Sequence, residues 1–153
     1  MKGMTHYQTA YMGEVDIPDD DQIVFPAGLP GWPDRTRFAV LFHEEMWPFY
    51  HLQSLEEAQL CFLTVDPFAF FRDYDFQLPE AIVEQLEIHA PEDIWVRNIV
   101  VVAEDFRQST VNLQAPVVIN HRRRLGRQVI LNDSRYAVKH PLFSKQAAGS
   151  GER

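Results

Sequence analysis

The sequence predicts a mostly β protein, a small antiparallel β-barrel-like domain with one or two short helices. Ten prolines are scattered from Pro18 to Pro141, and few stretches between them are long enough for a helix. Many short segments rich in Val, Ile, Phe and Tyr are bounded by Gly, Pro, Asp and Asn, as strands are. At 153 residues and 46% apolar content, the chain suits one domain with its own core.

The expected strands are short and follow one another closely, which favours an antiparallel barrel or sandwich. Alternation is clear at 110–114, where Val111 and Leu113 face one side and the polar residues between them face the other. The run at 117–119 predicts burial on both faces. In chain order we expect strands at 13–17, 22–25, 37–42, 49–54, 61–65, 94–103, 110–120 and 127–131.

The main helix is expected over 79–87, with Pro79 at its first helical position. Ile82, Val83 and Leu86 form an apolar stripe at helical spacing, while the glutamates stay in solvent. A further turn of helix is expected at 56–60. The pattern divides the chain into an N-terminal extension (1–12), the domain (13–143) and a flexible C-terminal tail (144–153).

The net charge of −8 is unevenly distributed. Residues 1–119 carry 20 acids and 6 bases, whereas residues 120–153 carry 2 acids and 8 bases. The acidic part repels nucleic acid and attracts a basic partner. No apolar run approaches the roughly 20 residues of a membrane span, and no signal peptide is recognisable. With the single Cys61, expected in the core, these features predict a cytoplasmic protein.

A catalytic alternative rests on Asp66, which precedes a proline in the aromatic segment FLTVDPFAFFRDYDF (62–76). Apolar rings would raise the pKa of this carboxyl, and His43 or His51 would complete a hydrolase pocket in the barrel mouth. The stronger interpretation is a turn, because Asp-Pro after a strand redirects the chain. The sequence holds no G-x-S-x-G motif and no metal-ligand spacing, and its GLPGW segment (28–32) indicates tight turns, not a phosphate loop.

The basic segment HRRRLGRQ (121–128) is the one candidate for nucleic-acid binding. Strand-like sequences flank it, so a solvated hairpin loop with its turn at Leu125-Gly126 is the stronger interpretation. Loop aromatics are a further signal: Trp32, Trp47, Phe49 and those of 67–71 either anchor a protein partner or cover the open ends of the barrel.

Taken together, several segments resemble the FliW family of flagellar assembly factors. Their order and spacing match the family over residues 13–143. Two positions depart from the family pattern. Trp32 stands where Phe or Leu is more usual, and Arg72 stands where proline is more usual. Arg72 also adds a positive charge to an acidic patch. The matching segments are GEVDIPDDDQIVFPAGLPGW, FYHLQSLEEAQLCFLTVDPFAFFRDYDFQLPE, APEDIWVRNIVVV, STVNLQAPVVIN and GRQVILNDSRYAVKHPLF.

This resemblance implies a regulatory binding protein that has no catalysis and needs no cofactor. Two protein partners are implied: flagellin, which is held in the cytoplasm before export, and CsrA, the RNA-binding regulator that represses flagellin translation. Flagellin and CsrA would exchange on the protein, so that secretion of flagellin relieves the repression. We expect a monomer in isolation that binds neither nucleic acid nor a membrane. The expected partner-binding residues are Asp66, Phe68, Phe71, Asp73, Tyr74 and Asn112.

Overall fold

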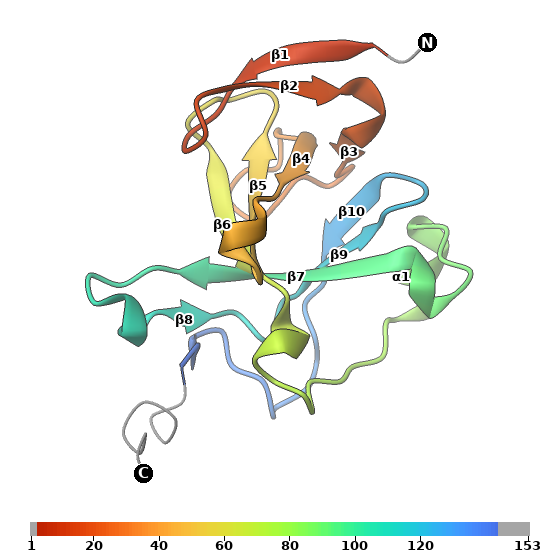
Figure 1. Cartoon of the computed structure of the whole chain (residues 1–153). Helices are drawn as coiled ribbons and strands as arrows, with labels where there is room; N and C mark the ends of the chain where they lie inside the picture. The colour runs from red at the N-terminus through yellow and green to blue at the C-terminus, as the bar shows by residue number, and fades with distance from the viewer. Residues whose placement is uncertain (1–2, 144–153) are drawn as a thin grey trace.

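The structure is a computed structural model that describes residues 3–143. Its main feature is a closed, mostly antiparallel barrel of seven strands, which confirms the predicted fold class (Figure 1). The strand order is β7-β6-β5-β4-β3-β10-β9, and the pairing of β9 with β7 closes the barrel. One neighbouring pair, β3 with β10, is parallel. The barrel strands are β3 (Ile23–Val24), β4 (Arg37–Leu41), β5 (Phe49–Ser54), β6 (Cys61–Val65), β7 (Ile94–Val101), β9 (Val117–Asn120) and β10 (Leu125–Gln128).

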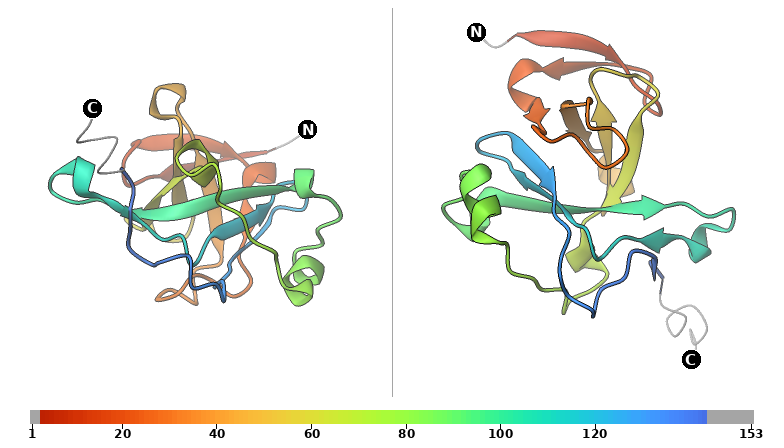
Figure 2. Two further views of the ribbon diagram at one scale, coloured as in Figure 1. Left: turned by 90° about the horizontal axis from the view of Figure 1, so that it is seen from below. Right: turned by 180° about the vertical axis from the view of Figure 1, so that it is seen from behind.

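Short strands extend the barrel at two places. β8 (Thr110–Val111) pairs with the end of β7, and β11 (His140–Pro141) pairs with β8. At the other end of the molecule, β1 (Met4–Gln8) and β2 (Glu14–Pro18) form a two-stranded ribbon across the barrel (Figure 2). β1 lies in the part of the chain taken as an N-terminal extension, where the sequence pattern indicated no strand. The tail expected at 144–153 lies outside the described residues.

Two hydrophobic cores lie on opposite faces of β7. The barrel interior is filled by Phe25, Phe38, Leu52, Ile119 and their neighbours, against which Trp95 and Ile99 pack. Val96 and Val100 alternate with these residues along β7 and face the second core. The lone α-helix of the described residues, α1 (Glu80–Gln85), covers this second core with Ile82 and its C-terminal neighbour Leu86. Two residues of the predicted apolar stripe, Ile82 and Leu86, are thus confirmed in the core, whereas Val83 is part-buried outside it. The helix is shorter than the expected 79–87, and Pro79 is its N-cap and not its first helical residue.

Three local predictions were wrong in detail. Residues 56–60 form a turn, not a helix, because the Ser54 hydroxyl accepts the N–H groups of Glu56 and Glu57. The strand expected over 110–120 is broken, since the Asn112 side chain accepts the N–H of Ala115 and closes a turn before β9. The basic hairpin turns at residues 121–124, and Leu125-Gly126 belongs to β10.

The remaining predicted strands agree with the structure to within a few residues. The GLPGW segment forms the expected tight turns, in which Gly28 and Gly31 adopt positive φ angles of 65° and 90°. The run at 117–119 is buried on both faces as expected. Within residues 3–143, no helix has the length and apolar character needed to cross a membrane.

Gly126 is required by the barrel core. A Cβ atom at this position would lie 2.5 Å from Cζ of Phe25, whose ring is fully buried against Phe38. We therefore expect Gly126→Ala to lower the free energy of unfolding by about 1–3 kcal/mol, the usual cost of overpacking a core. Urea unfolding followed by tryptophan fluorescence measures this loss, with Arg127→Ala, on the same strand but part-exposed, as the control. Equal stability of the Gly126→Ala variant and the wild type would contradict this account.

Candidate functional site

An aromatic groove lies where the chain leaves β6, beside the first half of β7. Its volume is about 830 Å³, and it is framed by residues 66–78, by α1 and by the turn that leads into β7. Its apolar lining is broad, and Asp66 and Asp75 bring carboxylates to it. The residues that line it are Asp66, Phe68, Tyr74, Asp75, Phe76, Gln77, Leu78, Val83, Ile88, His89, Ala90, Pro91, Ile94, Trp95, Val96 and Arg97.

Asp66 begins the segment as a turn residue, which confirms the turn interpretation. Its carboxylate accepts the N–H of Phe68 at 3.1 Å and caps the short 3-10 turn Pro67–Ala69. This turn directs the Phe68 side chain outward, so that 46% of Phe68 remains exposed. Phe68 still packs on Tyr74, at a distance of 5.9 Å between ring centroids. A large exposed aromatic held on a fixed turn is a suitable anchor for a protein partner.

Tyr74 fixes the segment to the sheet. It is only 5% exposed, and its hydroxyl donates to the Leu113 carbonyl at 2.6 Å while accepting from Nδ2 of Asn98 at 3.1 Å. Burial raises the pKa of Tyr74 to about 12, against the opposing effect of the Asn98 hydrogen bond. The hydroxyl therefore stays protonated at neutral pH. Tyr74 presents its ring to the groove and holds the groove wall in place.

The other predicted site residues lie outside the aromatic groove. Phe71 and Asp73 line a neighbouring cavity of about 440 Å³ together with Tyr74, Arg72 and others, and Phe71 packs edge-on against His140. Asp73 is exposed, whereas Asn112 is part-buried and engaged in the turn before β9. The structure thus brings Asp66, Phe68 and Tyr74 together, places Phe71 and Asp73 next to them, and gives Asn112 a structural contact.

Arg97 is a groove residue that the sequence reasoning missed. Its guanidinium lies 4.0 Å from the ring centroid of Tyr50 and 5.5 Å from that of Trp95, so two aromatic rings hold it at the barrel mouth. Burial lowers the pKa of this guanidinium, while Tyr50 and Asp66 act in the opposite direction. The available signal was the single charge within the apolar strand sequence IWVRNIVVV (94–102).

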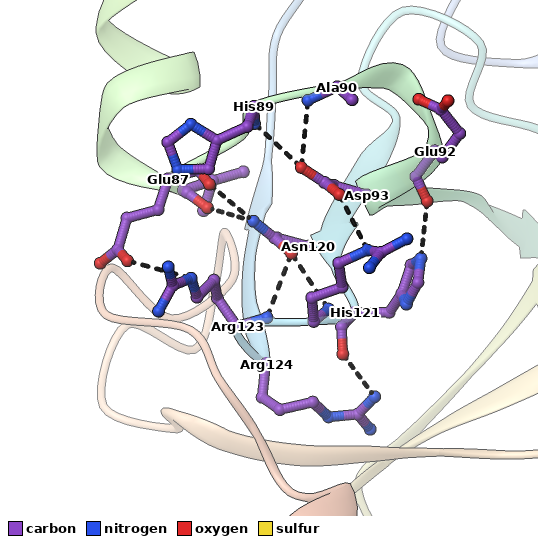
Figure 3. A network of polar contacts seen from close by, with 11 residues as sticks. Glu87, His89, Ala90, Glu92, Asp93, Asn120, His121, Arg123 and Arg124 are labelled. Atoms are coloured by element: carbon purple, nitrogen blue, oxygen red, sulfur yellow. Dashed lines mark hydrogen bonds and ion pairs between the residues drawn. The ribbon is translucent and has the colours of Figure 1, made fainter.

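The arginines of the basic hairpin are engaged by the protein itself, two of them in ion pairs (Figure 3). Arg122 pairs with Asp93 at 2.9 Å and Arg123 with Glu87 at 3.5 Å. Arg124 donates to the carbonyls of Asp21 and His121, and Arg127 donates to Gln85. The Asn120 side chain completes this network by donating to the carbonyls of Leu86 and Glu87 and accepting from the N–H groups of Arg122 and Arg123. Arginines engaged in this way are poorly placed to track phosphates.

The structure separates the residues that the hydrolase alternative requires. His43 and His51 line a different cavity from Asp66, beside Tyr11 and Met46, and His51 stacks on Tyr11. Asp66 is engaged with the N–H of Phe68. Cys61 is half-buried, and burial raises the pKa of its thiol to about 12, so it is no activated nucleophile. The carboxylate–histidine pair on which this alternative depends is therefore not formed.

Comparison with known proteins gives a consistent result. The family model described as "FliW protein" matches residues 6–142. The flagellar assembly factor FliW of Bacillus licheniformis is 46% identical over 135 residues, which cover 88% of this chain and 94% of that protein. The corresponding protein of Bacillus subtilis is 40% identical over 134 residues, with the same coverage. A crystal structure of the flagellar assembly factor FliW superposes with a TM-score of 0.87 at 38% identity and covers 92% of this chain and 98% of its own.

The hydroxyl of Tyr74 offers a test of how the groove wall is held. Tyr74→Phe leaves the buried Leu113 carbonyl without its donor, so we expect a loss of about 1–3 kcal/mol in the free energy of unfolding. Tyr136→Phe is the matched control, because the Tyr136 hydroxyl bonds to the exposed backbone of Asp75, where water can replace it. Chemical unfolding of both variants decides the matter. If Tyr74→Phe cost no more than Tyr136→Phe, the wall would not depend on this hydroxyl.

Proposed function

This chain is a member of the FliW family of flagellar assembly factors, and on that premise we propose that it is a cytoplasmic, non-enzymatic regulator that binds flagellin and antagonises CsrA. Flagellin occupies the protein until it is exported. The freed protein then captures CsrA, and repression of flagellin translation is relieved. The exchange of partners thereby couples the synthesis of flagellin to its secretion.

The single observation that carries this proposal is the aromatic groove with its acidic frame. Residues 66–93 contain eight acids and one base. Two of these acids, Glu87 and Asp93, pair with arginines of the hairpin, so six acids and one base remain, an excess of five negative charges. A surface of this kind attracts a basic RNA-binding protein and repels the RNA that competes for it. The exposed ring of Phe68 and the apolar groove floor supply the area that a protein partner buries.

We assign the partner contacts to Asp66 and Phe68 in the groove and to Phe71 and Asp73 in the cavity beside it. Tyr74 contributes its ring and supports this surface from behind. Asn112 supports it through the turn before β9. The two cavities adjoin at Tyr74, so one partner can cover both, or two partners can share the surface.

Direct binding with purified proteins tests the proposal. We expect the chain to form separate complexes with flagellin and with CsrA at micromolar concentrations, measured by isothermal titration calorimetry. Adding flagellin to the CsrA complex should then release CsrA, measured by size-exclusion chromatography. The absence of binding to both proteins at micromolar concentration would refute the proposed function.

Charge reversal tests the role of the acidic surface in capturing CsrA. The double substitution Asp73→Lys and Asp75→Lys should weaken CsrA binding about tenfold or more at low salt and make the affinity less dependent on salt. Asp34→Lys is the control, because Asp34 is exposed and lies outside both cavities. Titrations at two salt concentrations provide the measurement. Unchanged affinity and salt dependence in the double variant would place the CsrA site elsewhere.

A further inference from the structure

One half of β7 has an open backbone edge that faces the aromatic groove. The register with β9 pairs Trp95 with Ile119 and Arg97 with Val117. The His121 N–H donates to the Asp93 carbonyl in the same register, and the Asn112 N–H donates to the Ile99 carbonyl farther along the strand. Because backbone direction alternates along a strand, the odd-numbered residues of β7 point their N–H and C=O groups toward β9 and β8. Those of Ile94 and Val96 point the other way, toward β6.

β6 does not reach these two residues. Its last pair with β7 is Val65 with Asn98, after which the chain turns away at Asp66 (Figure 1). The next position that could bond to Val96 in this register is Pro67, which has no N–H and whose carbonyl accepts from Phe70 and Phe71. The edge of β7 at 94–97 is therefore left without a neighbouring strand on the β6 side.

The lining of the groove agrees with this geometry. Ile94, Trp95, Val96 and Arg97 all line it, although consecutive side chains of a strand point to opposite faces. If one face of β7 formed the floor of the groove, every second residue would line it. Four consecutive lining residues indicate that the edge of the strand forms the floor. Apolar side chains from 66–78 and from α1 stand on either side of this floor.

Arg97 covers part of the edge in the free protein. Its Nη1 donates to the carbonyl of Val96 at 2.8 Å, while its Nε is buried without a partner in the described part of the chain. The guanidinium thus occupies the acceptor that an added strand would use. An edge covered by a charged side chain is protected against indiscriminate pairing, yet it can be opened by rotation of that side chain.

We propose that this edge is a docking site for an extended segment of a basic partner protein, which adds to β7 as an antiparallel or parallel strand. The Val96 N–H and the carbonyls of Ile94 and Val96 supply main-chain hydrogen bonds, and apolar side chains of the segment enter the groove. Lys or Arg residues of the segment face the carboxylates of Asp66 and Asp75, which line the groove. The inference rests on the proposed function, in which CsrA is the basic partner.

A pair of substitutions at Val96 tests the edge. Val96→Pro removes the outward N–H and fills its direction with the proline ring, whereas Val96→Ala removes a similar side-chain volume and keeps the N–H. Neither change removes a hydrogen bond of the ladder with β9, because the N–H and C=O of Val96 point away from β9. We expect Val96→Pro to bind CsrA at least tenfold more weakly than Val96→Ala, measured by calorimetry with the full chain.

Amide hydrogen exchange in the wild-type protein gives a second readout that needs no variant. The Val96 amide should exchange more slowly by tenfold or more when CsrA is bound, and flagellin serves as the comparison. Equal CsrA affinity of the two variants together with an unprotected Val96 amide would overturn the docking site and leave the proposed function intact. If flagellin but not CsrA slowed exchange of the Val96 amide, the claim that the segment docked on the edge belongs to a basic partner would be overturned. Failure of both proteins to bind the wild type would instead remove the proposed function and this inference with it.

Discussion

The pairing of β7 with β9 is the interaction on which the rest of the structure depends. It closes the seven-stranded barrel, and it makes β7 the boundary between two cores. Trp95 and Ile99 extend into the barrel interior, while Val96 and Val100 support the core beneath α1. A strand buried on both faces tolerates few polar side chains unless each finds a partner. Asn98 meets this condition through its Nδ2, which donates to the Tyr74 hydroxyl and the Asn112 carbonyl and so joins three segments at one buried point. Its Oδ1 is buried without a partner among residues 3–143.

The groove follows from a mismatch between strand lengths. β7 has eight residues and is paired along one side by both β9 and β8, whereas β6 has five and meets only the middle of β7. The chain that leaves β6 must then cross the outer face of the sheet to reach α1, and Tyr74 fixes it there. The space between this crossing segment and the uncovered part of β7 is the groove. The groove is thus built from a strand edge, a tethered loop and a short helix, which together leave part of the β7 edge without a neighbouring strand.

The sequence predicted the elements that depend on local pattern. Strand positions followed from β-branched and aromatic runs between turn residues, and α1 followed from its apolar stripe. The sequence did not predict features that depend on contacts between distant residues. Residues 56–60 have helix-forming composition, but the Ser54 hydroxyl captures their N–H groups in a turn. By apolar character alone Phe68 would be buried before Tyr74, yet Tyr74 is buried and Phe68 is exposed, and the Tyr74 hydroxyl finds its partners in the distant residues Leu113 and Asn98.

Contacts with distant residues also distinguish the basic hairpin from the acidic residues around the groove. Two arginines of the hairpin, Arg122 and Arg123, pair with Asp93 and Glu87, so part of the charge that suggested nucleic-acid binding is cancelled within the molecule. The carboxylates of Asp66, Asp73 and Asp75 have no ion pair of this kind among residues 3–143 and remain as the acidic field around the groove. An exposed field of this sort acts over about a Debye length and mainly accelerates encounter, so its effect falls with salt. In the proposed complex, main-chain hydrogen bonds and apolar burial at the β7 edge act only after contact and govern dissociation. On this proposal, attraction and retention of a partner arise from different residues of one surface, and each can change without the other.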